Sequence, residues 1–185
     1  MSTTAKTNEN HLIKTVHQVL DNKAPPHQIV VDQTAANIAT VKKLLECANN
    51  HDIAGYGPLF SPDALFEPED VPPIPMDGFL KYCLHLHGCF PDCKFTYTSI
   101  KKSTENFAIV VDGARFSGTH TGGAYSPDPT IFPPIPPTGT TVVNDEERWF
   151  FYFDPTSGKI KSWAVIALGP STGPLGAYEI LRLAM

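Results

Sequence analysis

One short segment of the chain gathers side chains that are suited to binding metal ions. From residue 83 to residue 93 the sequence reads CLHLHGCFPDC, with three thiols and two imidazoles, both preferred zinc ligands. On a helix, His85 and Cys89 would lie on one face and Cys83 and His87 on another, so four ligands would not converge. The C-x2-C spacing of zinc knuckles is also absent. We therefore predict buried, reduced thiols here, and neither a metal site nor another cofactor.

A histidine and a pair of glutamates are candidates for moving protons. His120 shares its strand parity with apolar residues such as Val110 and Phe116. If that face lines an interior, His120 can act as a general base near neutral pH; alternatively, it ends the strand and bonds to the following loop. Glu146 or Glu147 would supply a carboxylic acid or base if it were directed inward, and a surface ion pair is the alternative.

The composition limits the classes of protein in which such groups could work. The chain has 185 residues, of which 42% are hydrophobic and 18% charged, values typical of one folded domain with or without an extension. Its net charge of −5 argues against nucleic acid as a partner. No apolar run approaches the ~20 residues of a membrane helix. The N-terminus lacks the apolar core of a signal peptide, so we expect a cytoplasmic protein with reduced cysteines.

Hydrophobic periodicity predicts helices in the first half of the chain. Apolar residues recur at helical spacing over residues 11–20, 34–49 and 78–89. Between the last two, residues 51–76 are rich in Gly, Pro and Asp, and we predict a loop with short turns. Residues 1–31 are expected to form an N-terminal extension with a short helix, ahead of a main domain over 32–185.

The second half of the chain changes to the pattern of β-strands. Residues 94–101, 107–122, 141–154 and 160–168 are rich in β-branched and aromatic side chains. Helices followed by a run of antiparallel strands indicate an α+β fold with helices packed on one face of a bent sheet. The proline-rich insertion at residues 124–137 must leave the sheet, because proline cannot donate to the ladder.

Several short motifs occur in a fixed order along the chain. They are FPD at residues 90–92, SGTHTG at 117–122, IPPTG at 135–139 and GKI at 158–160, before Trp163. As a set they resemble the SnoaL-like polyketide cyclases of the NTF2-like superfamily, over roughly residues 34–168. The resemblance implies a cone in which a curved antiparallel sheet wraps around helices and encloses a pocket for a small hydrophobic molecule.

The resemblance also implies cofactor-free chemistry that depends on a buried carboxylate. The family carries an aspartate on its last strand, but here that place is taken by Ala167 or Leu168. We therefore expect His120 to be the catalytic group, assisted by Tyr56 or by a strand carboxylate. The side chains expected to contact the ligand are Phe60, Tyr82, Phe116 and Trp163.

Two hypotheses for the function follow. In the first, the chain is a metal-independent enzyme of the cyclase, isomerase or hydrolase type. In the second, it is a non-catalytic ligand-binding or interaction module, which the missing aspartate favours. Under either hypothesis we expect a homodimer, with the apolar residues 169–185 covering the cone or completing the dimer, and no nucleic-acid or membrane partner.

Overall fold

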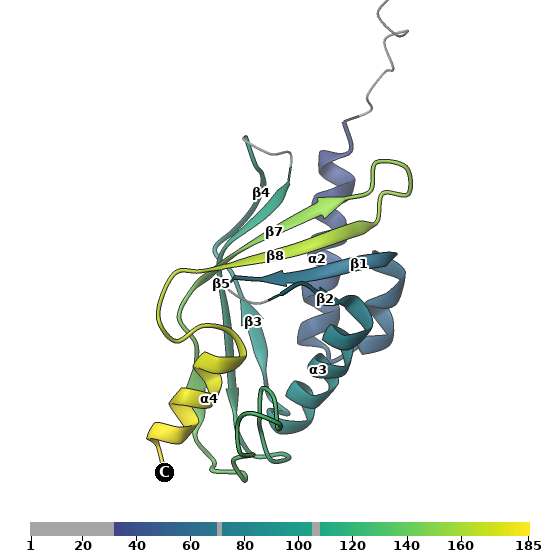
Figure 1. The fold of residues 1–185 in the computed structure, drawn as a ribbon. Coiled ribbons are helices and arrows are strands. Elements are labelled where there is room, and N and C mark those ends of the chain that lie inside the picture. The colour runs from purple at the N-terminus through teal and green to yellow at the C-terminus, as the bar shows by residue number, and fades with distance from the viewer. Residues whose placement is uncertain (1–31, 70–71, 105–107) are drawn as a thin grey trace, which may run out of the picture. The chain divides into compact units, whose positions relative to one another are not determined.

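Eight strands among the described residues, 32–69, 72–104 and 108–185, form a curled mixed sheet (Figure 1). In the computed structural model they are β1 (Phe60–Pro68), β2 (Ile74–Pro75), β3 (Lys94–Thr96), β4 (Ser99–Lys102), β5 (Ile109–Thr119), β6 (Thr141–Val143), β7 (Glu147–Phe153) and β8 (Ile160–Ala167). Their order is β2-β1-β8-β7-β5-β3, and β4 and β6 also pair with β5. The paired strands are antiparallel except β1 and β8, which are parallel.

The long strand β5 bends the sheet. Its first half pairs with β4 and β7, and its second half pairs with β3 and β6. Between the halves the register with β7 shifts from Val111 to Ala114, and Gly113 there has a φ of 62°. A larger residue would be strained at that φ, and its Cβ would lie only 2.8 Å from the side chain of Thr98. Glycine at this position therefore permits the bend.

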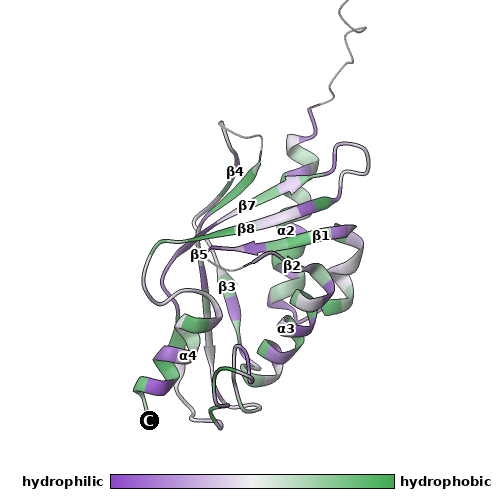
Figure 2. Ribbon diagram, viewed as in Figure 1, coloured by the Kyte–Doolittle hydropathy of each residue, from purple (hydrophilic) through white to green (hydrophobic). Residues whose placement is uncertain are grey.

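Three α-helices among the described residues accompany the sheet: α2 (Thr34–Asn49), α3 (Met76–Cys89) and α4 (Gly173–Leu183). Helix α2 contacts β3, β4 and β5, and helix α3 contacts β1 and β2, whereas α4 contacts β6. Each helix alternates hydrophobic and hydrophilic positions around its axis (Figure 2). The helices predicted at 34–49 and 78–89 are confirmed, and the one predicted at 11–20 lies outside the described residues.

The loop prediction for residues 51–76 is wrong in two parts, because strand β1 occupies Phe60–Pro68 and the short strand β2 occupies Ile74–Pro75. Strand β1 contains Pro62 and Asp63, which are unfavourable in a regular strand. The parallel register with β8 is interrupted between Phe60 and Leu65, which allows the ladder to skip the proline. Burial of Phe60, Ala64 and Phe66 against the core stabilises a strand that local propensity disfavours.

The C-terminal segment is a helix and not only an apolar tail. Helix α4 begins with Gly173-Pro174, and its proline occupies the first turn, where the missing N–H costs nothing. Its buried face consists of Gly176, Ala177, Tyr178 and Leu181. The hydroxyl of Tyr178 donates to the carbonyl oxygen of Pro133 at 2.9 Å, and this bond joins α4 to the proline-rich insertion.

The core consists of two hydrophobic clusters. The first lies between α2, α3 and the sheet and contains Phe79, Trp149, Phe151 and Trp163. The second contains Phe90 after α3, Phe116 of β5, Tyr125 of the proline-rich insertion and Leu181 of α4. The predicted α+β class is thus confirmed, with helices α2 and α3 packed against the inner face of a curled sheet. None of the helices in the described part of the chain has the length and apolar character needed to cross a bilayer.

Candidate functional site

A carboxylate on β7 lies at the inner face of the sheet. Strand alternation places Glu147 on the same face as Trp149, whose side chain is buried in the first core cluster. The indole Nε1–H of Trp149 donates to Oε2 of Glu147 at 2.6 Å, and the backbone N–H of Gly173 bonds to the same carboxyl group. Burial raises the pKa of Glu147 above its ordinary value, although both hydrogen bonds oppose the shift. Such a carboxyl group is suited to general acid–base chemistry.

The position of Glu147 in the sheet relates it to the expected family aspartate. In the antiparallel ladder between β7 and β8, Glu147 lies directly opposite Ala167. Residues paired in this way project to the same face with their Cβ atoms about 4.5–5.5 Å apart. Ala167 is one of the two positions at which the resemblance implies an aspartate. The chain therefore has no carboxylate at Ala167 on β8, but it has one, Glu147, at the paired position on the neighbouring strand β7.

Two tyrosine hydroxyls form a short hydrogen-bonded chain in the same interior. Tyr125 donates to the carbonyl oxygen of Pro174 at 2.9 Å, so its hydroxyl accepts from Tyr82 at 3.1 Å. Burial raises the pKa of both hydroxyls, and the charge of Glu147 adds to the rise at Tyr82. The hydroxyl of Tyr82 therefore remains protonated and neutral at physiological pH, and the negative charge of Glu147 contributes to this.

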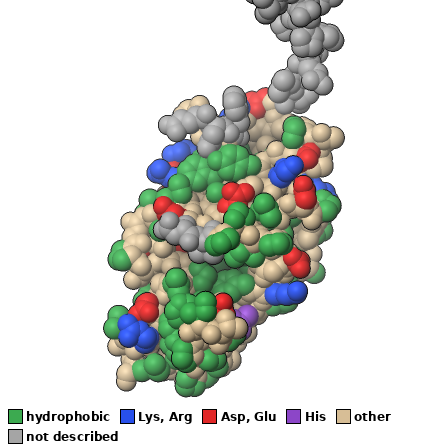
Figure 3. All heavy atoms as spheres, in the orientation of Figure 1, with side chains coloured by type: hydrophobic (Ala, Val, Ile, Leu, Met, Phe, Trp, Pro, Cys, Tyr) green, Lys and Arg blue, Asp and Glu red, His purple; other side chains and the backbone are tan. Residues whose placement is uncertain are grey.

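Hydrogen bonds connect the beginning of helix α4 to Glu147 and Tyr125. Asn144 donates through Nδ2 to the carbonyl oxygen of Gly173 at 2.9 Å, while Tyr125 and Glu147 bond to Pro174 and Gly173 as described. On the face shown in Figure 3, the surface is hollowed between α3 and α4 and hydrophobic side chains border the hollow. These bonds fix the helix at the side of the fold where Glu147 and Ala167 lie.

The predicted catalytic His120 is fully buried and both of its ring nitrogens have partners. Its Nε2 bonds to the carbonyl oxygen of Gly123 at 2.9 Å, and Nδ1 lies 3.5 Å from the hydroxyl of Thr138. The backbone of His120 also bonds to Gly139 and Thr140. The ring therefore joins the SGTHTG motif to the IPPTG motif, which favours the strand-end alternative. A catalytic role for His120 stays a prediction.

The remaining predicted residues are distributed over both core clusters. Phe60, Trp163 and the second catalytic candidate, Tyr56, belong to the first cluster, Phe116 belongs to the second, and Tyr82 contacts both. Burial raises the pKa of Tyr56 strongly, so its hydroxyl is a poor proton donor to solvent at neutral pH. The Nε1–H of buried Trp163 has no hydrogen-bond partner among the described residues. An interior donor without a partner is available to an acceptor on a bound molecule.

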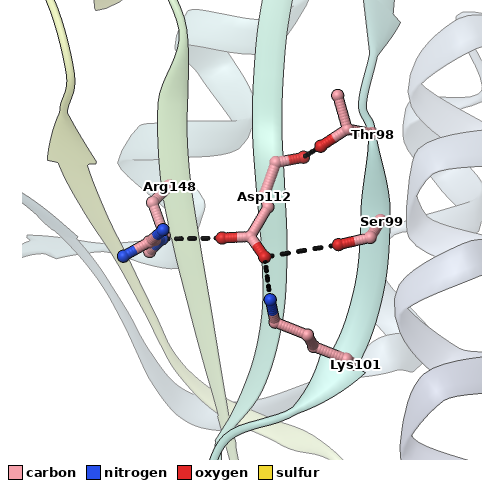
Figure 4. A network of polar contacts seen from close by, with 5 residues as sticks. All are labelled: Thr98, Ser99, Lys101, Asp112 and Arg148. Atoms are coloured by element: carbon pink, nitrogen blue, oxygen red, sulfur yellow. Dashed lines mark hydrogen bonds and ion pairs between the residues drawn. The ribbon is translucent and has the colours of Figure 1, made fainter.

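A different carboxylate, Asp112 on β5, forms ion pairs with two cations, Lys101 and Arg148 (Figure 4). Arg148 donates through Nε to Oδ1 at 2.7 Å, and Lys101 pairs with Oδ2. The hydroxyl of Ser99 also bonds to this carboxylate, at 3.3 Å. The hydrogen bond from Lys101, followed by that from Arg148, lowers the pKa of Asp112. Asp112 is therefore ionised at neutral pH and serves as a structural anion.

The surface also has a depression that none of the predicted site residues lines. Its volume is about 310 Å³ and it lies beside the C-terminal half of α2. The lining residues are Lys42, Leu45, Glu46, Asn49, Asn50 and Tyr97. Their mixed, largely charged and amide character does not match a small hydrophobic ligand.

The four thiols are free and buried, as the sequence predicts. Burial raises the pKa of Cys83 to about 12 and that of Cys93 to about 11. At neutral pH these thiols are protonated, so none of them has the lowered pKa of a nucleophilic cysteine.

Glu147 is the site residue that the sequence left open. The sequence allows either Glu146 or Glu147 to face inward, and the structure shows a different orientation for each. Glu146 forms the surface pair, at 3.1 Å from Arg115, while Glu147 faces inward. The usable signal was parity: Glu147, Trp149 and Phe151 alternate with Glu146, Arg148 and Phe150, and the first set carries the two most buried aromatic residues of the strand.

Solved structures share this fold at low sequence identity. AclR from Streptomyces galilaeus, a "putative hydroxylase", aligns with a TM-score of 0.58 and 21% identity over 72% of this chain and 79% of AclR. IdmH from Streptomyces antibioticus, a "putative polyketide cyclase", aligns with a TM-score of 0.56 and 19% identity over 80% of this chain and 99% of IdmH. SalBIII, an epoxide hydrolase/cyclase-like enzyme of salinomycin pyran-ring formation, aligns with a TM-score of 0.54 and 16% identity, covering 75% and 93%.

The family assignment rests on the sequence itself. No curated protein matches the chain significantly. The family model of the SnoaL-like domain, however, matches residues 41–163, which include the C-terminal half of α2, all of α3 and the strands up to the middle of β8. The matched region also contains Glu147 and the SGTHTG and IPPTG motifs. The chain belongs to the SnoaL-like domain family.

Proposed function

We propose that this protein binds a small hydrophobic molecule at the inner face of the sheet and catalyses a metal-independent proton transfer on it, with Glu147 as the general acid or base. The reaction class would be cyclisation, isomerisation or hydrolysis; among the structural neighbours, IdmH is described as a putative polyketide cyclase and SalBIII as an epoxide hydrolase/cyclase-like enzyme. The observation that carries the proposal is the inward carboxyl group of Glu147, paired across the ladder with Ala167.

The environment of Glu147 supports an acid–base role. Its neighbours are an indole, a backbone amide and the tyrosine pair, and no cation among the described residues pairs with the carboxylate. The unpartnered Nε1–H of Trp163 supplies a donor in the same aromatic cluster, since the Trp149 and Trp163 ring centroids are 5.0 Å apart. A base together with a hydrogen-bond donor suits a substrate in which a carbonyl oxygen is polarised while a neighbouring carbon loses a proton.

A proton-exchange experiment tests this chemistry without knowledge of the natural substrate. The probe is 1-phenyl-1,3-butanedione, an enolisable aromatic diketone, whose loss of α-protons in deuterated buffer is followed by NMR. We expect the protein to accelerate the exchange and Glu147→Gln to reduce the acceleration by at least about 100-fold, the usual contribution of a general base. Glu146→Gln is the matched control, since its side chain is on the surface, and it should retain the full rate. Equal rates in the two variants would refute the role of Glu147.

A second candidate function is a non-catalytic, homodimeric binding module. It is favoured by exposed hydrophobic side chains on and beside α4, among them Leu168, Leu175 and Leu183. Light scattering after size-exclusion chromatography would give the mass in solution, and Leu175→Glu with Leu183→Glu should convert a dimer into a monomer. A dimer that binds a hydrophobic dye but gives no exchange with the diketone would favour this function over catalysis.

A further inference from the structure

We propose that His51, His87 and Cys93 form a binding site for a zinc-type transition-metal ion. His51 follows α2, His87 is in the last turn of α3, and Cys93 immediately precedes β3. The nitrogen and sulfur atoms that these side chains offer lie within 4.8 Å of one another. The site uses none of the groups around Glu147 and does not depend on the proposed proton transfer.

The spacing of the atoms suits a tetrahedral ion. Nε2 of His51 lies 3.5 Å from Sγ of Cys93. A zinc ion with Zn–N of about 2.0–2.1 Å and Zn–S of about 2.3 Å separates such ligands by about 3.5 Å at the tetrahedral angle. The rings of His51 and His87 stack with centroids 4.2 Å apart, so rotation of the imidazoles is the adjustment that binding requires.

His87 provides an independent sign that a partner is missing. Its Nδ1 is buried and has no hydrogen-bond partner among the described residues. Buried polar nitrogens are normally satisfied by protein, water or an ion. His51 in turn adopts a left-handed backbone conformation with a φ of 57°, which is uncommon for a residue other than glycine. This conformation accompanies the position of its ring between His87 and Cys93.

The donor set selects the class of ion. Two imidazole nitrogens and one thiolate match zinc and other borderline metals, whereas magnesium and calcium require oxygen ligands. On binding, the thiol of Cys93 gives its proton to solvent and its sulfur donates an electron pair to the metal. Three protein ligands leave a fourth position for water or an external ligand. The bound ion would join the ends of α2 and α3 to the start of β3.

The sequence alone does not predict this site, because His51 is far from His87 and Cys93 along the chain. The segment from residue 83 to 93 contributes only His87 and Cys93, and its other thiols and imidazole belong elsewhere. The thiol of Cys89 donates to the carbonyl oxygen of Ala124. Among the described histidines, His85 is the one within hydrogen-bond distance of Cys89. His51 comes from 42 residues before Cys93 and completes the set.

Cobalt titration of the reduced 185-residue chain tests the proposal. Cobalt(II) is the probe because a thiolate ligand gives it a charge-transfer band in the near ultraviolet, and the background carries His11, His17 and His27 as Gln to remove histidines outside the cluster. We expect one equivalent of cobalt to bind with this band and zinc to displace it. Cys93→Ser should abolish the band and weaken zinc binding by at least about 100-fold, since a first ligand matters no less than an outer-shell partner.

Matched variants distinguish this site from other thiols. Cys89→Ser removes an equally buried thiol with a single histidine neighbour and should leave the band and the zinc affinity unchanged. His87→Gln should weaken zinc binding by at least about tenfold and serves as the test if Cys93→Ser does not fold, as judged by circular dichroism. No cobalt band, or a band that survives Cys93→Ser or His87→Gln, would overturn the proposal.

Discussion

Glu147 and Asp112 are carboxylates on neighbouring strands whose surroundings are opposite in character. Asp112 accepts from Arg148 and pairs with Lys101, and its pKa is lowered. Glu147 is one residue before Arg148, but the alternation of β7 turns it to the inner face, where burial raises its pKa. The comparison shows that alternation along the strands separates two kinds of carboxylate. Asp112 on the outer face joins strands through ion pairs, whereas Glu147 on the inner face has a pKa that burial raises.

The largest effect should come from moving the inner carboxylate across the ladder. Glu147→Gln is expected to lose at least about 100-fold of the diketone exchange rate. Adding Ala167→Asp to that variant should restore at least about tenfold, because residue 167 lies directly opposite residue 147 in the ladder and projects to the same face of the sheet. The exchange rate of the double variant is the measurement. Failure of the double variant to exceed the single one would break the equivalence of the two positions.

The same substitution should have the opposite effect on stability. The pKa of Glu147 is raised in the folded protein, so its favourable contribution is present below the unfolded-state value of 4.5 and is lost as pH rises through the folded value. At pH 7 the ionised carboxylate costs stability, and Glu147→Gln should raise the free energy of unfolding by roughly 0.5–2 kcal/mol. Urea unfolding at several pH values measures this, and the gain should vanish below pH 4.5. A loss of stability at pH 7 would contradict the assigned direction.

Asp112→Asn should show the reverse pH dependence. Because the pKa of Asp112 is lowered, its contribution is present above the unfolded-state value of 3.8 and is lost as pH falls through the folded value. We expect Asp112→Asn to lower the free energy of unfolding by about 1 kcal/mol at neutral pH, the sum of two modest ion pairs. The diketone exchange rate should not change. A substantial loss of exchange activity would mean that the two faces of the sheet are coupled.

The smallest expected effect is that of one cation on the outer face. Lys101→Met removes one exposed partner of Asp112 and should lower the free energy of unfolding by roughly 0.2–1 kcal/mol. Because salt screens such pairs, the difference from the wild type should shrink in 1 M sodium chloride, where the screening length is about 3 Å. Denaturation in low and high salt is the measurement, and a difference that is independent of salt would point to lost packing of the Lys101 stem.

Local patterns were sufficient for the regular parts of this fold. The stripe Val41, Leu44 and Leu45 predicted α2, and the β-branched and aromatic segments predicted β5, β7 and β8. Strand β1 could not be predicted, because Pro62 and Asp63 disfavour it locally and its partner β8 is remote in sequence. Its parallel pairing is a tertiary effect that no short window contains.

The candidate site shows the same division between local and remote information. Strand parity already separated Glu147 from Glu146 and Arg148, but only the packing of α2 and α3 shows which face is internal. The hydrogen bond from Gly173 to Glu147 and the contact of His120 with Thr138 join segments that are remote in sequence, and no spacing rule predicts them. The sequence therefore indicated the groups, and the long-range pairing assigned their roles.

The parallel pairing of β1 with β8 also constrains how the protein forms on the ribosome. Ser61 bonds to the carbonyl oxygen of Ile160, 99 residues further along the chain. Contacts of such long range slow folding, because a large loop must close before the pairing stabilises it. Until β8 is synthesised, the two-residue strand β2 is the only strand in the described part of the chain that can pair with β1, and the other edge of β1 is open to other chains. The nascent protein therefore depends on the arrival of β8 to be protected from aggregation, and a chain truncated before residue 160 would retain that open edge.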